Sequence, residues 1–264
     1  VRRTRKQEFL AQMQLVVPWA VLVELIAPYY PEGKNGRPPF ALETMLRVHF
    51  LQQWFSLSDP AMEEAFFDVP VYRQFAQLDA NGRLPDESTI LRFRHRLERH
   101  KLSEQILTCV NDLLSARGLL LKSGTAVDAT LIPAPSSTKN KGKERDPEMH
   151  SSQKGKQWYF GMKAHIGVDA DSGLVHTVRG TSGNVADVTE GNSLLHGQET
   201  DVYGDAGYQG AHKRADAKEG VTWHVAMRPG KRKALDKENN RIDALTDLLE
   251  KIKAGIRAKV EHPF

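Results

Sequence analysis

Apolar side chains between residues 9 and 121 recur three or four positions apart, and proline and glycine residues separate the segments that carry them. This spacing is the period of an amphipathic helix. A helix at 41–55 has apolar positions at Leu42, Met45, Leu46, Phe50 and Leu51. Another begins after Asp86, whose carboxylate is suited to accept hydrogen bonds from the free amides of a first turn. The pattern predicts an all-helical N-terminal domain at 1–121.

The pattern changes at Thr125, where residues 125–132 form an apolar run that contains one carboxylate, Asp128. Runs of this length and composition are typical of buried strands. Further strands are expected at 158–168, 174–179, 200–203 and 221–227. A terminal helix follows, with an apolar stripe formed by Ile242, Leu245, Leu249, Ile252, Ile256 and Val260. The order of these elements predicts an α/β domain at 122–264, with helices on the faces of a mixed sheet.

Residues 136–157 differ from the rest of this domain, because Met149 is their only strongly apolar residue. They also contain six basic residues: Lys139, Lys141, Lys143, Arg145, Lys154 and Lys156. A segment with so little apolar surface to bury is expected to be a disordered basic loop.

Composition restricts the class of protein. Of the 264 residues, 40% are hydrophobic and 27% are charged, which is typical of a globular domain. The 37 basic and 33 acidic residues give a net charge of only +4, so any electrostatic attraction to a polyanion must be local. The single cysteine, Cys109, excludes an intrachain disulfide. The apolar stretch from Leu15 to Val23 is too short to cross a membrane, and a cytoplasmic location is expected.

Three carboxylates are candidates for metal binding. Asp128 lies within an apolar strand, where an unpaired charge is costly, and Asp205 follows another short strand between two glycines. Glu261 lies at the far end of the terminal helix, one turn after Arg257. Carboxylates from separate segments suit Mg²⁺, which prefers oxygen ligands. A salt-bridged strand end, a turn aspartate and an exposed ion pair explain the same three residues without a metal.

Four segments of the second domain carry a resemblance to a known family. They are VDATLI around Asp128, WYFGMKAHIGVDADSGLVHTVRGTSGNVADV at 158–188, YGDAGYQG around Asp205, and the R-x-x-x-E spacing of Arg257 and Glu261. Together they resemble the DDE transposases of bacterial insertion sequences, and among these the group named after insertion sequence five. The stretches GRPPFALETMLRVHFLQQWFSLSD and LPDESTILRFRHRLE resemble the helical N-terminal domain of the same group.

The resemblance implies a ribonuclease H-like fold whose catalytic residues Asp128, Asp205 and Glu261 hold two Mg²⁺ or Mn²⁺ ions. It implies binding to terminal inverted repeats, metal-dependent strand cleavage and strand transfer to target DNA. Because two DNA ends must be held together, at least a homodimer is expected. The enzyme would work in the cytoplasm, at the nucleoid.

Two positions depart from the tyrosine-arginine-glutamate-lysine signature of the family. Ala254 stands where the tyrosine is expected, and the expected lysine would lie beyond Phe264, so the chain is expected to be C-terminally shortened. This leaves open an alternative, a catalytically inactive relative that binds the repeats and inhibits transposition. A nonspecific nuclease on the same fold is a third possibility.

DNA contacts are expected on the helix that follows Asp86. Arg92, Arg96 and Arg99 share one face, and Arg94 and Lys101 add charge beside them. Such a face suits DNA phosphates, although a solvated helix surface has the same pattern. Further candidate contacts are Lys154, Lys156 and Arg257.

Two other features have a structural explanation. Asp187 precedes a predicted helix, so capping is its expected role, with a place near the active site as the alternative. The ten histidines show no pair at metal-ligand spacing, and a zinc site is not expected.

Overall fold

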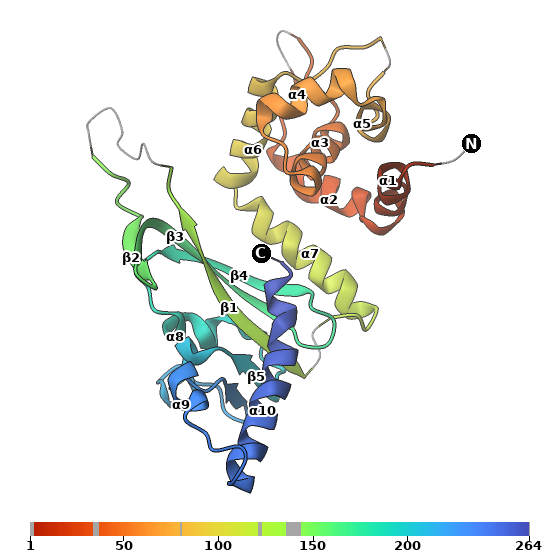
Figure 1. Ribbon diagram of the computed structural model, residues 1–264. Coiled ribbons are helices and arrows are strands. Elements are labelled where there is room, and N and C mark those ends of the chain that lie inside the picture. Colours follow the sequence, from red (N-terminus) through yellow and green to blue (C-terminus); the bar gives the residue numbers. More distant parts are fainter. Residues whose placement is uncertain (1–2, 34–36, 80, 121–122, 136–143, 264) are drawn as a thin grey trace. The chain divides into compact units, whose positions relative to one another are not determined.

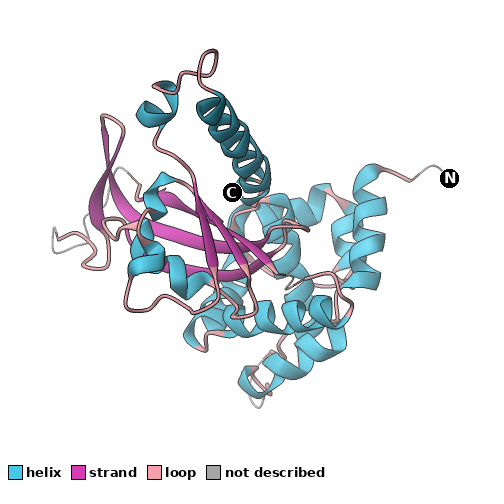
Figure 2. Cartoon of the chain, turned by 90° about the horizontal axis from the view of Figure 1, so that it is seen from below, coloured by secondary structure: helices cyan, strands magenta, loops and turns pink. Residues whose placement is uncertain are grey.

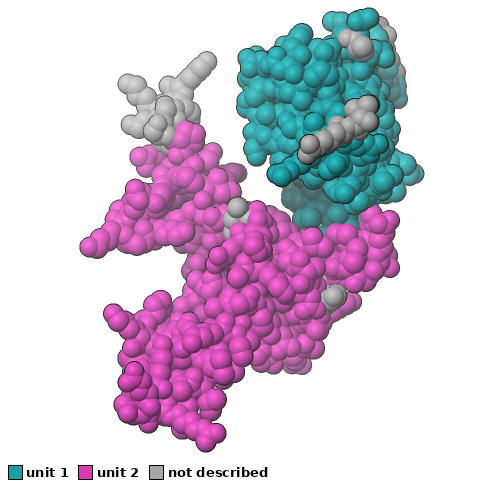
Figure 3. All heavy atoms as spheres, turned by 45° about the vertical axis from the view of Figure 1, so that its right-hand side comes forward, with its two compact units in different colours: residues 1–112 teal, residues 113–264 magenta. Residues whose placement is uncertain are grey.

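The computed structural model describes residues 3–33, 37–79, 81–120, 123–135 and 144–263. The chain divides into two compact units, residues 1–112 and residues 113–264, which are coloured separately in Figure 3. The division falls inside one helix, and each unit is described by itself.

The first unit is helical, as the apolar spacing predicts. Its elements in chain order are α1 (Arg5–Val16), α2 (Trp19–Ile26), η1 (Ala27–Tyr29), α3 (Leu42–Phe55), α4 (Asp59–Asp68), α5 (Pro70–Phe75), α6 (Glu87–Arg99) and α7 (Leu102–Ala116), whose last residues belong to the second unit (Figure 1). Side-chain caps mark several starts: Thr4 forms a capping box with Gln7, and Asp86 Oδ1 accepts the Thr89 N–H at 2.7 Å.

The core of the first unit surrounds a buried arginine. Arg47 is 1% exposed, and its guanidinium lies over the ring of Trp19, 4.2 Å from the ring centroid. It donates to Glu43 Oε1 at 2.6 Å and to the Phe75 carbonyl at 3.1 Å. Its charge is therefore paired and hydrogen-bonded, which offsets the cost of removing it from water.

The second unit is built on a mixed sheet with the strand order β2-β3-β1-β5-β6, in which β4 also pairs with β3. Its elements are β1 (Gly124–Pro133), β2 (His150–Lys154), β3 (Gln157–Asp169), β4 (Val175–Ser182), α8 (Asp187–Glu190), η2 (Gly191–Leu194), β5 (Asp201–Gly204), η3 (Ala206–Tyr208), η4 (Ala211–Lys213), β6 (Thr222–Val225), α9 (Pro229–Lys233), α10 (Arg241–Arg257) and η5 (Ala258–Glu261). β1 pairs antiparallel with β3 and parallel with β5. This is the mixed α/β fold expected for a ribonuclease H-like domain, and α10 packs against β1 and β5 of the sheet. Figure 2 draws the strands in magenta and the helices in cyan.

The expectation of a disordered loop at 136–157 is wrong for its C-terminal part. Residues 150–154 form β2, which turns through Gly155 and pairs with β3 from Lys154↔Gln157 to His150↔Gly161. The pairing uses backbone groups, so it does not need apolar side chains, and the polar residues of β2 stay mostly exposed. Residues 136–143 lie outside the described residues.

The terminal helix α10 turns its polar side, not its apolar stripe, toward the rest of the unit. Ile242, Leu245, Leu249 and Ile252 are each more than half exposed. The buried residues of α10 are Asp247 and Glu250. Asp247 pairs with Arg232 at 2.8 Å, and Glu250 Oε2 accepts the Met227 N–H at 2.8 Å. Ion pairs therefore hold this helix where its periodicity predicted apolar packing.

Within the described part of the chain, no single helix is long and apolar enough to span a membrane, although α1 and the segment Trp19–Tyr29 pass the test together as a pair bent by 68°.

His49 on α3 gives the first unit an acid-sensitive position. Burial, with a contribution from Arg94, lowers the pKa of His49 to about 4 from an ordinary value of 6.5, so the ring is neutral at pH 7. Between pH 6.5 and 4 the unfolded chain binds a proton at His49 that the folded chain does not. As the pH decreases from 6.5 to 4, the free energy of unfolding should therefore decrease, by up to about 3 kcal/mol from this residue.

His49→Leu should flatten that dependence. Urea denaturation at several pH values between 7 and 4, followed by tryptophan fluorescence, measures it for the parent and the variant. His95→Leu, at an exposed position on α6, is the control. Equal pH slopes for His49→Leu and the parent would contradict the assignment.

Candidate active site

The parallel pairing of β1 and β5 brings two aspartates side by side. Ala126 on β1 lies opposite Tyr203 on β5, and Asp128 and Asp205 each follow two residues later on the same strand path. Asp128 Oδ1 accepts the Ala129 N–H at 2.8 Å, and Asp205 Oδ1 accepts the Gly207 N–H at 2.7 Å. One oxygen of each carboxylate is thus tied to the local backbone.

The electrostatics of Asp128 reflect this neighbourhood. Burial raises the pKa of Asp128, the nearby carboxylates of Asp205 and Asp187 raise it further, and the guanidinium of Arg257 and the Ala129 N–H act in the opposite direction. The ionised form of Asp128 is disfavoured by these acids, so a positive charge placed among them would stabilise the site.

Asp187 is a third acid of this site. It begins α8, and its Oδ1 accepts a hydrogen bond from Lys163 Nζ at 2.8 Å. Gly207 separates it from Asp205: a Cβ at Gly207 would lie 2.9 Å from Asp205 Oδ1 and 3.3 Å from Asp187 Oδ2. The main sequence interpretation, a helix cap, missed this proximity. The sequence contains one clue to the contact between Lys163 and Asp187, an acid and a lysine 24 residues apart. The clue becomes informative only when the hairpin between the two residues is known.

Glu261 lies differently from the two aspartates. It ends η5, its side chain is 67% exposed, and it forms an ion pair with Arg257 at 3.8 Å. Val260 beside it is fully buried against Ala126 and Ile166 of the sheet. The backbone near Glu261 is therefore anchored to β1 and β3, while its carboxylate extends into solvent.

A buried tyrosine adjoins the acids. Burial and the charges of Asp187, Asp128 and Asp205 all raise the pKa of Tyr208, so its hydroxyl stays protonated. Within the described residues this buried hydroxyl has no hydrogen-bond partner. The Tyr208 ring packs beside Gly204, where a Cβ would lie 3.0 Å from it.

Comparison with known families agrees with this geometry. Residues 120–264 match the model of the transposase DDE domain, and residues 2–96 match that of a second transposase domain. The chain belongs to the DDE transposase family. No solved structure matches it. The family implies DNA binding and the use of a divalent cation. The residues of the site fit such a cation, because Asp128, Asp205 and Asp187 supply carboxylate oxygens from three segments.

The basic residues of α6 in this transposase fall into two groups. Arg94 bridges to Asp59 at 2.7 Å and lies 3.7 Å from Glu98, and Arg96 donates to the Tyr29 carbonyl at 2.8 Å. Arg92 and Arg99 are exposed, as are Lys101, which lies just beyond the end of α6, and Lys154 and Lys156 at the tip of the β2–β3 hairpin. A cleft of about 380 Å³ beside α6 is lined by four arginines: Arg37, Arg83, Arg92 and Arg96.

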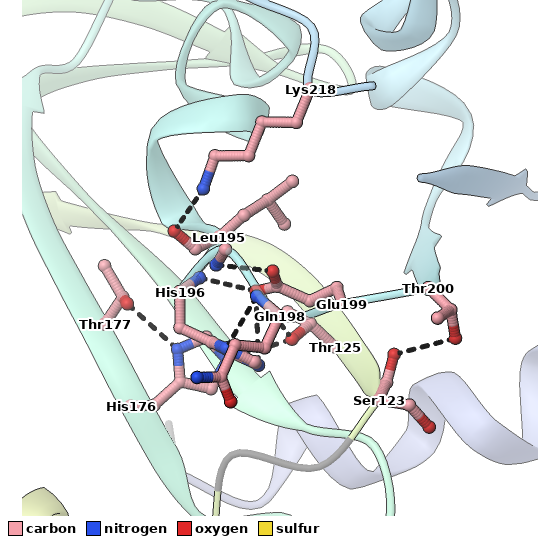
Figure 4. Close-up of polar contacts among 11 residues, drawn as sticks. Ser123, Thr125, His176, Thr177, Leu195, His196, Gln198, Glu199, Thr200 and Lys218 are labelled. Atoms are coloured by element: carbon pink, nitrogen blue, oxygen red, sulfur yellow. Dashed lines mark hydrogen bonds and ion pairs between the residues drawn. The ribbon is translucent and has the colours of Figure 1, made fainter. Parts of the chain in front are cut away.

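The catalytic unit of the transposase contains a second polar cluster, shown in Figure 4. His176 of β4, His196 and Glu199 converge on Thr125 of β1, although no histidine pair was expected from the sequence. Their potential metal-ligand atoms all lie within 4.8 Å of one another. Because the residues come from separate segments, linear spacing does not reveal the cluster.

The hydrogen bonds of this cluster are nearly complete without an ion. Glu199 accepts the N–H groups of His196 and Gly197, at 2.5 and 2.6 Å, and the Thr125 hydroxyl at 3.3 Å. His196 Nδ1 accepts the Gln198 N–H at 3.3 Å, which leaves the proton of a neutral ring on Nε2, 3.3 Å from Glu199. A metal bound at that nitrogen would have to displace the proton. We therefore interpret the cluster as a buried structural network.

Glu199→Gln tests this interpretation. The amide keeps the shape of the side chain, but its nitrogen cannot accept an N–H, so one buried donor loses its partner. We expect the free energy of unfolding to fall by about 1–3 kcal/mol. Urea denaturation followed by tryptophan fluorescence measures the loss, with Glu219→Gln, at an exposed position, as the control. An unchanged midpoint for Glu199→Gln would contradict a structural role.

Proposed function

We propose that this chain is an insertion-sequence transposase of the group named after insertion sequence five. It binds terminal inverted repeats, cleaves strands at the ends of its element and transfers them to target DNA. The observation that carries the proposal is the pairing of parallel strands in a DDE domain that brings together Asp128, within β1, and Asp205, directly after β5.

In this proposal Asp128, Asp205 and Glu261 are the catalytic and metal-binding residues. When two Mg²⁺ or Mn²⁺ ions are bound, they supply activation of a water or a 3′-hydroxyl and stabilisation of the leaving oxygen. The chain itself orients the acids: the Ala129 and Gly207 amides hold Asp128 and Asp205, and Val260 anchors the turn that carries Glu261. Arg257 favours the ionised form of Asp128, and in this proposal it also contacts the DNA backbone.

The two parts of the chain have separate tasks in this proposal. The helical domain at 1–121 binds DNA and supports oligomerisation, and the domain at 122–264 carries out the chemistry. Exposed Arg92, Arg99 and Lys101 face phosphates, while Arg94 and Arg96 also brace the helix that presents them. Since both ends of the element must be cut together, the active species is at least a homodimer on the DNA.

Asp128→Asn should reduce cleavage of a plasmid carrying the inverted repeats that flank this coding sequence by about 100-fold or more, because a neutral amide no longer stabilises cationic charge. The assay follows nicked and linear products with Mg²⁺ or Mn²⁺. Asp216→Asn, in an exposed ion pair with Arg214, is the control and should cleave normally. Cleavage by Asp128→Asn at the parent rate would refute the assignment.

Replacing both Arg92 and Arg99 with glutamine should weaken binding to repeat DNA and lower its salt dependence. Each lost phosphate contact removes about 0.9 from the slope of log affinity against log salt, so the double variant should lose nearly 2. Fluorescence anisotropy at four salt concentrations measures the slope. A double variant of exposed Arg5 and Arg241 removes the same charge elsewhere and should keep the parent slope. Equal slopes for all three proteins would exclude α6 as a phosphate-binding face.

A further inference from the structure

We propose that Asp187, oriented by Lys163, is an additional acidic residue of the metal site formed by Asp128 and Asp205. This inference rests on the proposed function, since it assigns a further ligand to the same cation site. It changes the role of Asp187 from a helix cap to an acid that takes part in cation binding.

Lys163 fixes the position of Asp187 from the neighbouring sheet. Its Nζ donates to Asp187 Oδ1 at 2.8 Å and to the Val185 carbonyl at 2.7 Å, so the ammonium bridges β3 to the start of α8. The Lys163 side chain is only 13% exposed, and that of Asp187 is 30% exposed. A partly buried pair with two hydrogen bonds restrains the carboxylate far better than an exposed ion pair does.

The free oxygen of Asp187 borders the space beside Asp205. Oδ2 lies 3.3 Å from the position that a Cβ at Gly207 would occupy, and that same position is 2.9 Å from Asp205 Oδ1. Any side chain at 207 would therefore press on both carboxylates. The glycine leaves room between the two acids, which is what a shared cation requires.

The hydrogen bonds leave one oxygen of each acid available. Among the described residues, Asp128, Asp205 and Asp187 each accept hydrogen bonds through Oδ1 alone. Their three Oδ2 atoms remain as ligands from β1, the end of β5 and the start of α8. Mg²⁺ and Mn²⁺ bind such oxygens directly or through retained waters.

The charges point in the same direction. Three carboxylates meet Lys163 and Arg257, which leaves an excess of negative charge in a partly buried place. A divalent cation would remove that excess. A purely structural Lys163–Asp187 pair explains the link between β3 and α8, but it does not explain why the second oxygen of Asp187 and the carboxylate of Asp205 both border the space at Gly207.

The test measures metal binding directly, with Mn²⁺ as the probe and the full chain freed of metal. Isothermal titration calorimetry, and electron paramagnetic resonance of the free Mn²⁺, give the dissociation constant without DNA or catalysis. We expect Asp187→Asn to weaken Mn²⁺ binding about 10-fold or more. Glu190→Gln removes a negative charge from the other end of α8, where Glu190 pairs with Arg179, and should bind like the parent.

Gly207→Ala provides a second variant that keeps every charge. Its methyl group would force the carboxylates of Asp205 and Asp187 apart, so we expect weaker Mn²⁺ binding together with a parent-like urea midpoint. If Asp187→Asn fails to fold, Gly207→Ala decides the matter. Parent-like Mn²⁺ binding by a folded Asp187→Asn, or by Gly207→Ala in its place, overturns the inference.

Asp128→Asn separates this failure from failure of the proposed function. In one outcome, Asp128→Asn binds Mn²⁺ weakly and does not cleave DNA, whereas Asp187→Asn binds Mn²⁺ like the parent. This outcome would support the proposed function and exclude only Asp187 from the site. Parent-like Mn²⁺ binding and cleavage in Asp128→Asn would instead refute the proposed function itself.

Discussion

The arrangement of the second unit depends on one constraint, the parallel register between β1 and β5. With Ala126 opposite Tyr203, Asp128 within β1 and Asp205 directly after β5 each lie two residues beyond the same paired position. Burial raises the pKa of Asp128, and repulsion from the neighbouring carboxylates of Asp205 and Asp187 adds to that cost. Several surrounding features of the unit serve to hold these charges in position.

The compensation comes from distant parts of the chain. Arg257 comes from the end of α10, and Lys163 of β3 partly neutralises Asp187. Tyr208 occupies the buried side of the site, where Gly204 makes space for its ring. The long strand β3 carries Lys163: it pairs with β1 along nine residues and places Lys163 opposite Leu131, three residues after Asp128.

The sequence predicted the parts of this site that one segment determines. Asp128 stood out as a carboxylate within an apolar strand, and Asp205 as an acid between glycines at a strand end. Asp187 was interpreted mainly as a helix cap, with a place near the active site only as the alternative, and the cluster of His176, His196 and Glu199 was not recognised. The partners of these residues lie on other segments, and only the tertiary fold brings them together. β2 was missed for a different reason: its stability comes from backbone pairing with β3, which leaves no apolar pattern.

The terminal helix shows how periodicity misleads when charge dominates packing. The apolar stripe of α10 predicted the buried face, yet Asp247 and Glu250 occupy that face because Arg232, Lys253 and the Met227 amide pair with them there. The buried apolar residue that positions the site is Val260, which follows α10 and packs η5 against β1 and β3. Since Val260 directly precedes Glu261 and Arg257 lies one turn before it, packing fixes the backbone while the exposed carboxylate keeps its rotamer freedom. Glu261 therefore differs from the aspartates in kind: backbone amides already orient the two aspartates, whereas binding of a cation would have to order Glu261.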